Sequence, residues 1–177
     1  MQARSLLTAG WALGLALVLG SCGETMSSGS GFQLKYAVAR NALEAGDYER
    51  ARKAYLKLIS QAGPLTPRLQ LEYAHAELRA GNFSEAASAA SNLAQSQSGT
   101  ARGQSGTARG AALAVQGTAQ HELGLILLSQ DQTAAGKAQL VAAQKALSEV
   151  LKSHADLDPL GGMAGRKASI AARLKAL

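Results

Sequence analysis

The chain has 177 residues, a formal net charge of +6 and 4% aromatic residues. Three prolines, a single cysteine and scattered β-branched residues argue against a sheet or a disulfide-linked fold, and abundant alanine and leucine favour helix. A basic chain can bind nucleic acid, but no basic stripe with interleaved aromatics is present. The alternative is a solvated helical surface with mild attraction to anionic surfaces, so we expect an all-α protein without a nucleic-acid partner.

Residues 1–21 have the pattern of a signal peptide. Arg4 supplies a positive start, and the apolar run over residues 6–20 is too short to cross a membrane comfortably. The run ends in Leu19-Gly20-Ser21-Cys22. This ending resembles the bacterial lipoprotein signal, in which small residues precede a cysteine that is lipidated and becomes the new first residue.

Cys22 is the only cysteine and has no intrachain disulfide partner. The resemblance implies a covalent lipid on Cys22, with no other cofactor, and a lipid anchor in the cell envelope. Gly23, where an aspartate would favour the inner membrane, implies the outer membrane, facing the periplasm. The alternative is an ordinary leader with an incidental cysteine. Residues 22–31 are expected to be the lipidated cysteine and a flexible Ser/Gly-rich tether.

A helix–turn–helix pattern occurs twice in residues 32–98. Gly46 suits a left-handed helix end and Asp47 an N-cap, and 35 residues later Gly81 and Asn82 take the same places. Thr66 is expected to cap a helix that has Pro67 in its first turn. The pattern predicts helices over residues 32–45, 47–61, 66–80, 83–95, 133–153 and 163–177.

Paired antiparallel helices in units of about 34 residues resemble the tetratricopeptide repeat. Both units have the turn glycine, a polar residue, an aromatic residue and, three positions later, an alanine; the last two are Tyr48 with Ala51 and Phe83 with Ala86. The units depart from the family where Lys35 and Gln70 replace its opening large residue. The resemblance implies a helix-pair solenoid over residues 32–177 with a C-terminal capping helix.

A third unit is expected after a low-complexity insertion at residues 96–110. In the register of Leu123-Gly124, Asp131 falls at the turn and Gly136 at the small position where the helices cross. The insertion duplicates seven residues and is rich in glycine, serine and threonine, which oppose a stable helix, although its Ala-Arg steps would allow a frayed one. It could be a basic finger that carries Arg102 and Arg109, or a tolerated loop expansion.

The sequence offers little for catalysis, and we expect no enzyme activity, catalytic residues or metal site. No two of the histidines, His75, His121 and His154, stand at metal-ligand spacing, and no serine lies in a strained elbow. A cofactor bound to the purified protein would instead indicate an enzyme or an enzyme accessory.

A partner-binding groove is implied by the tetratricopeptide resemblance, because the first helix of each unit lines the concave face in that family. The residues at the matching positions are Tyr36, Arg40, Glu44, Arg68, His75, Arg79 and His121. The three arginines could bind carboxylates or an acidic peptide. The alternative is that these are ordinary surface side chains.

These observations predict a lipid-anchored periplasmic scaffold whose partner is another envelope protein or peptide segment. It would assist the assembly or piloting of an envelope complex such as a pilus or a secretion system. The alternative is a structural envelope lipoprotein that binds anionic envelope polymers through its basic C-terminal helix. Residues 137–177 carry seven basic and three acidic side chains, which supports that alternative.

Overall fold

The computed structural model describes residues 27–97 and 104–177, and within these ranges every regular element is a helix. The first four α-helices are α1 (Ser27–Glu44), α2 (Tyr48–Ile59), α3 (Thr66–Arg79) and α4 (Phe83–Ser96). They are followed by α5 (Gln104–Ser129), α6 (Thr133–Ser153) and α7 (Gly162–Lys175). Two short 3₁₀ turns, η1 (Gly63–Leu65) and η2 (Ala155–Leu157), precede α3 and α7.

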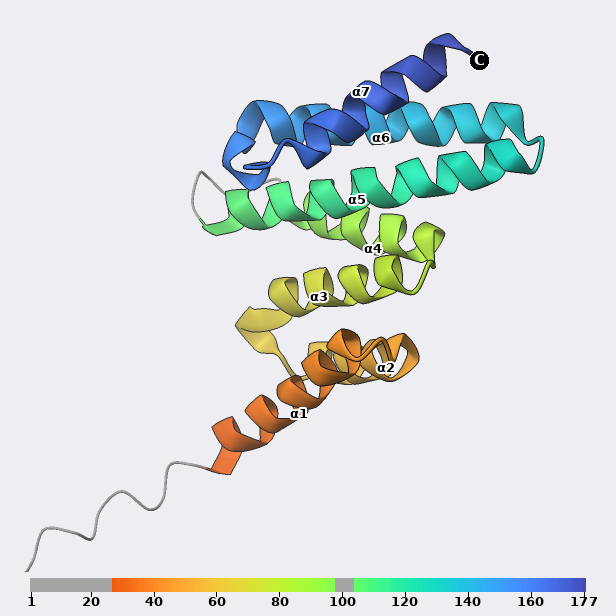
Figure 1. Ribbon diagram of the computed structural model, residues 1–177. Coiled ribbons are helices and arrows are strands. Elements are labelled where there is room, and N and C mark those ends of the chain that lie inside the picture. The colour runs from red at the N-terminus through yellow and green to blue at the C-terminus, as the bar shows by residue number, and fades with distance from the viewer. Residues whose placement is uncertain (1–26, 98–103) are drawn as a thin grey trace, which may run out of the picture.

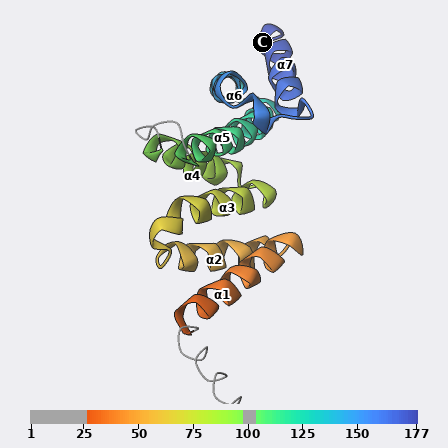
Figure 2. The ribbon, with the colours of Figure 1, turned by 90° about the vertical axis from the view of Figure 1, so that its left-hand side faces the viewer.

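The helices stack in chain order, as Figures 1 and 2 show. Each helix from α2 to α6 packs between its two neighbours in the sequence, and α7 packs on α6. α1 therefore lies at one end of the stack and α7 at the other (Figure 1). This arrangement confirms the predicted all-α helix-pair solenoid with a C-terminal helix that covers its last pair.

The same turn joins the helices of all three pairs. Gly46 and Gly81 have a φ of 79°, and Asp131, as predicted for the third turn, has a φ of 60°. In each turn the next amide donates to the carbonyl five residues earlier, at 2.9, 3.0 and 2.9 Å. This is the Schellman arrangement, in which a left-handed residue satisfies the last carbonyls of a helix.

The second helix of each pair has a small residue at the same position, four residues after the N-cap. Ala51, Ala86 and Gly136 are buried, and each amide donates to the carbonyl of the N-cap residue four positions earlier. Asp47 adds a side-chain cap, since its Oδ1 accepts from the amide of Arg50 at 3.2 Å. The small side chains let the second helix approach the first closely.

Two glycines, Gly124 and Gly136, mark a close crossing of α5 and α6. A Cβ added to Gly124 would lie 3.1 Å from the carbonyl oxygen of Gly136, and one added to Gly136 would lie 3.0 Å from that of Gly124. Leu140 and Leu128 cover the two glycines, with side-chain carbons 2.9 and 2.7 Å from these Cβ positions. The two backbones are therefore in contact, and neither position has room for a methyl group.

A buried ion pair links α2 to α3. Glu77 is fully buried, and its carboxylate accepts from Arg52 Nε at 2.5 Å and from Asn82 Nδ2 at 2.7 Å. Burial alone would raise the pKa of Glu77. Hydrogen bonds from Tyr73, Asn82 and Arg52 outweigh that effect and hold the pKa below its ordinary value.

Three sequence-based expectations about local structure were wrong. The flexible tether was expected to extend to residue 31, but α1 already begins at Ser27. Residues 104–110 of the expected insertion form the start of α5, where Gly110 lies so close to His154 that a Cβ would meet the ring at 2.6 Å. Packing against the α6–η2 segment thus overrides weak helix propensity. Thr66 is the first residue of α3, and Leu65 takes the N-cap position without a side-chain cap.

The large and small apolar side chains of α1 are not all buried. Ala42 and Leu43 are buried, whereas Leu34 and Val38 are 69% and 45% exposed. Among the described residues no helix covers the side of α1 and α2 on which they lie, because α1 is the first helix of the described stack. The predicted signal peptide, Cys22 and residues 98–103 lie outside the described residues. In the ranges described, no helix is long and apolar enough to cross a membrane.

The α5–α6 crossing gives the first testable prediction. We expect Gly136→Ala to lower the free energy of unfolding by about 1–3 kcal/mol, because the methyl group overpacks the crossing. Gly165→Ala on α7 is the matched control, since nothing lies within 4 Å of its added Cβ. The control should raise stability by about 0.5–1 kcal/mol through helix propensity alone. Thermal and denaturant unfolding measure the stability of both variants. An equal gain in stability from Gly136→Ala and Gly165→Ala would contradict the tight α5–α6 crossing.

The second prediction concerns the buried pair. Arg52→Met leaves the Glu77 carboxylate buried without its cation, and we expect a loss of about 1–3 kcal/mol in unfolding free energy. Lys53→Met removes an exposed pair with Glu49 and should change stability by less than about 0.5 kcal/mol. Denaturant titration separates the two cases, and an equal effect of both variants would contradict the role of the buried pair.

The Glu77 pair also has a pH signature. Because its pKa is lowered in the folded protein, its stabilising contribution is complete above the ordinary pKa of 4.5. That contribution is lost as the pH falls through the lowered folded-state value. Glu77→Gln should therefore flatten the acid limb of the stability curve.

Candidate partner-binding surfaces

Three predicted groove residues on α1 gather around Glu72 of α3. The Tyr36 hydroxyl donates to Glu72 Oε1 at 3.3 Å, and Arg40 Nη1 donates to Glu72 Oε2 at 3.2 Å. Arg40 Nη2 also donates to Glu44 at 2.9 Å. Hydrogen bonding to Glu44 and attraction to Glu72 raise the pKa of Arg40. Arg40 is thus already paired with two carboxylates of its own chain.

Two further predicted residues, His75 and Arg79, extend this cluster along α3. The His75 side chain keeps exposed surface, yet the surrounding helices remove enough hydration to lower its pKa. Glu72 opposes this shift, while Arg40 and Arg79 add to it. The Arg79 guanidinium lies over the Tyr48 ring, 5.5 Å from its centroid. Five of the seven predicted residues therefore lie in one region along α1 and α3. Tyr36, Arg40 and Arg79 already contact other residues of the chain there, namely Glu72, Glu44 and Tyr48.

Arg68 and His121 do not belong to this cluster. Arg68 is exposed near the start of α3 and has no ion pair with any residue in the described ranges. His121 lies on α5 and is only 8% exposed. Its Nδ1 lies 2.6 Å from Arg166 Nη1 of α7, and the same nitrogen of Arg166 pairs with Glu122. His121 was expected in the partner groove, but it joins the capping helix to the third pair.

The contact with Arg166 determines which ring nitrogen of His121 carries the proton. Arginine can only donate, so Nδ1 accepts and the proton of the neutral ring is on Nε2. Burial lowers the pKa of His121 first, Arg166 lowers it further, and Glu122 opposes both. The ring is therefore a neutral hydrogen-bond acceptor at neutral pH.

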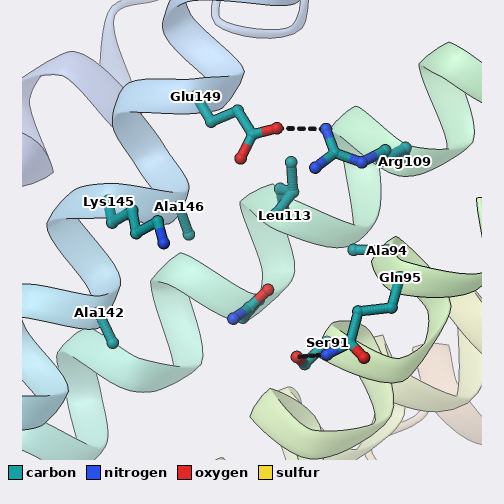
Figure 3. Close-up of a pocket in the computed structure, with 10 residues that line it drawn as sticks. Ser91, Ala94, Gln95, Arg109, Leu113, Ala142, Lys145, Ala146 and Glu149 are labelled. Atoms are coloured by element: carbon teal, nitrogen blue, oxygen red, sulfur yellow. Dashed lines mark hydrogen bonds and ion pairs between the residues drawn. The ribbon is translucent and has the colours of Figure 1, made fainter. Parts of the chain in front are cut away.

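A second surface, which the sequence did not predict, is a groove with α5 as its floor and α4 and α6 as its walls. It consists of two adjoining cavities of about 360 and 300 Å³ that share Ser91. Figure 3 shows the first cavity, with Ser91 and Gln95 on one side and Lys145 and Glu149 on the other. We call these two cavities the α4–α6 groove.

Amide and hydroxyl side chains make up most of its polar lining. The polar uncharged residues are Ser84, Ser88, Ser91, Asn92, Gln95, Gln116, Gln120 and Gln139. The charges nearly cancel, because Arg109 forms an ion pair with Glu149 and only Lys145 is left over. Two buried atoms of the lining, Gln120 Oε1 and Arg109 Nε, have no hydrogen-bond partner among the described residues. The groove thus offers many donors and acceptors and little net charge.

A signal for this groove was present in the sequence. Ser84, Ser88, Ser91 and Gln95 recur at helical spacing, as do Gln116 and Gln120. A polar stripe on a helix is usually the solvated face, so periodicity alone could not separate a groove wall from ordinary surface. The distinction depends on α5 joining α4 and α6, which only the tertiary structure shows.

Comparison with known proteins adds no relative: no protein-family model, curated protein or solved structure matches the chain. Residues 27–97 and 104–177 also contain no group of three or more potential metal ligands.

The His121–Arg166 contact gives the third prediction. Proton NMR titration should place the pKa of His121 below its ordinary value of 6.5, and Arg166→Met should raise it, because the neighbouring positive charge is removed while Glu122 remains. Since the folded-state pKa is the lower one, protonation favours the unfolded chain. Stability should therefore fall as the pH drops below the unfolded-state pKa. An unchanged pKa in the variant would contradict the contact.

Proposed function

We propose that the protein is a lipid-anchored scaffold of the cell envelope that holds an extended polypeptide segment of another envelope protein in the α4–α6 groove. The observation that carries this proposal is a groove whose polar lining consists mostly of amide and hydroxyl side chains, set among alanine and leucine residues. An extended peptide presents alternating N–H and C=O groups. Asn and Gln side chains complement both, because each carries a donor and an acceptor.

The layout of the chain supports the envelope location and the scaffold role. A lipoprotein-like signal ending in Cys22 precedes a solenoid of helix pairs. In this layout it resembles lipoproteins that serve in the assembly of pili and secretion channels. Repeat solenoids present extended surfaces for partners, which suits assembly or piloting of such a complex.

The polar character of the groove favours a peptide over an acidic polymer. The Arg109–Glu149 pair leaves little positive charge in the α4–α6 groove. On α1, Arg40 is already held between the carboxylates of Glu44 and Glu72. Of the basic residues on α7, Arg166 is already paired with Glu122. Binding to anionic polymers through α7 remains the alternative, and it would depend on Lys167, Arg173 and Lys175.

The fourth prediction tests the groove by site-specific photo-crosslinking in the native envelope. A photoreactive residue at Lys145, which lines the groove, should give one dominant crosslinked protein. The same residue at Ser169, exposed on α7, is the control and should give none. Ser88→Arg places a bulky charge at the groove wall and should abolish the Lys145 product without unfolding the domain, since Ser88 is exposed.

Companion variants separate the two candidate surfaces. Arg68→Glu with Arg79→Glu changes the originally predicted groove and should leave the Lys145 product unchanged. Arg40 is left intact because reversing it would place three acidic groups together. Loss of the product only in this double variant would move the site to α1 and α3. Diffuse, salt-sensitive products centred on α7 would favour the polymer-binding alternative.

A further inference from the structure

The outer side of the first helix pair carries an apolar groove that no helix of the described chain covers. It has a volume of about 410 Å³ and a mainly apolar lining, with Leu34, Val38 and Ala54 among its residues. Leu34 and Val38 are among the exposed large apolar side chains of the protein. We call this cavity the end groove.

The two ends of the described helix stack differ in whether a further helix covers them. The last helix pair is covered by α7, whereas α1 packs chiefly on α2 and begins the stack (Figure 1). An exposed apolar patch of this kind, with basic neighbours, indicates an interaction site. The lining residues include Lys35 and Lys57 and no carboxylate. Neither lysine has an ion-pair partner among residues 27–97 and 104–177.

We propose that the end groove rests on the surface of a phospholipid bilayer. Leu34 and Val38 would enter the boundary between headgroups and acyl chains, and Lys35 and Lys57 would contact anionic headgroups. Apolar residues flanked by lysines are the usual composition of helices that lie in a membrane interface. The proposal rests on the proposed lipid anchor at Cys22 and goes further, because it fixes which end of the solenoid faces the bilayer.

The length of the connecting chain supports this occupant. Cys22 precedes the first residue of α1, Ser27, by five positions. Five residues span at most about 18 Å even when fully extended. An anchor at Cys22 therefore keeps α1 close to the bilayer, while the α4–α6 groove lies several helices further along the stack (Figure 2).

The charge of the groove argues against a second copy of this chain as the occupant. A two-fold symmetric pair would bring the same patch of both copies together. Lys35 and Lys57 of both copies would then meet with no carboxylate in either lining. Anionic phospholipids, in contrast, supply the missing negative charge.

The experiment uses the lipidated full-length protein purified from the envelope and reconstituted into vesicles of phosphatidylethanolamine and phosphatidylglycerol. Lipid on Cys22 blocks its thiol, so Val38→Cys provides one reactive site for an environment-sensitive fluorophore. The matched control is Val141→Cys on α6, which is 51% exposed and far along the stack. Lipids that carry a nitroxide near the glycerol backbone serve as quenchers.

We expect the probe at position 38 to show blue-shifted emission and quenching by the nitroxide lipids, and the probe at 141 to show neither. Lys35→Gln with Lys57→Gln should reduce the quenching in anionic vesicles. Replacing phosphatidylglycerol by phosphatidylcholine should have the same effect. Both lysines are at the surface, so the variant should fold normally, which circular dichroism checks.

Three outcomes would overturn the proposal. An unquenched probe at 38 in vesicle-bound protein would show that the end groove faces water. Blue-shifted emission without lipid quenching would show that protein or the anchor's own acyl chain fills the groove. A dimer that disappears on Leu34→Asp would assign the groove to a second copy. Mass spectrometry of Cys22 tests separately whether the protein carries a lipid anchor. If it carries none, the probe at position 38 in a Cys22→Ser background still tests whether the end groove binds the bilayer.

Discussion

The architecture depends on one repeated backbone constraint, the left-handed residue that ends the first helix of each pair. Gly46, Gly81 and Asp131 reverse the chain with the same hydrogen bonds, so each second helix starts in the same direction relative to the first. A small residue four positions after each N-cap then permits close crossing. Three equivalent pairs follow from three equivalent turns, and stacking them produces the solenoid.

Different interactions hold the stack together along its length. Near the start, the fully buried Glu77 joins α2, α3 and the second turn through charge-assisted hydrogen bonds. Near the end, α5 and α6 make backbone contact at Gly124 and Gly136, where dispersion between close-packed atoms replaces polar contacts. The Arg166–Glu122 pair and its contact to His121 then fasten α7 over the last pair.

The two halves of the molecule offer surfaces of opposite character. The end groove on α1 and α2 is apolar and flanked by lysines, whereas the α4–α6 groove carries many amides and hydroxyls beside its alanines and leucines and is nearly neutral. A scaffold that is anchored at its N-terminus would need one surface for the membrane and another for its partner. Placing them at separate positions along the stack would let both be occupied at once.

The sequence alone determined the helical class, the turn at each pair and the small crossing residues, because these follow from local rules on glycine, caps and helical spacing. The start of α5 within a Gly/Ser-rich segment was decided by packing, since Gly110 fits against His154 where a larger residue would not. The same holds for His121, whose environment depends on α7, 45 residues away in sequence. The α4–α6 groove combines three helices, and its polar stripes became distinct from ordinary surface only once the neighbouring helices were in place.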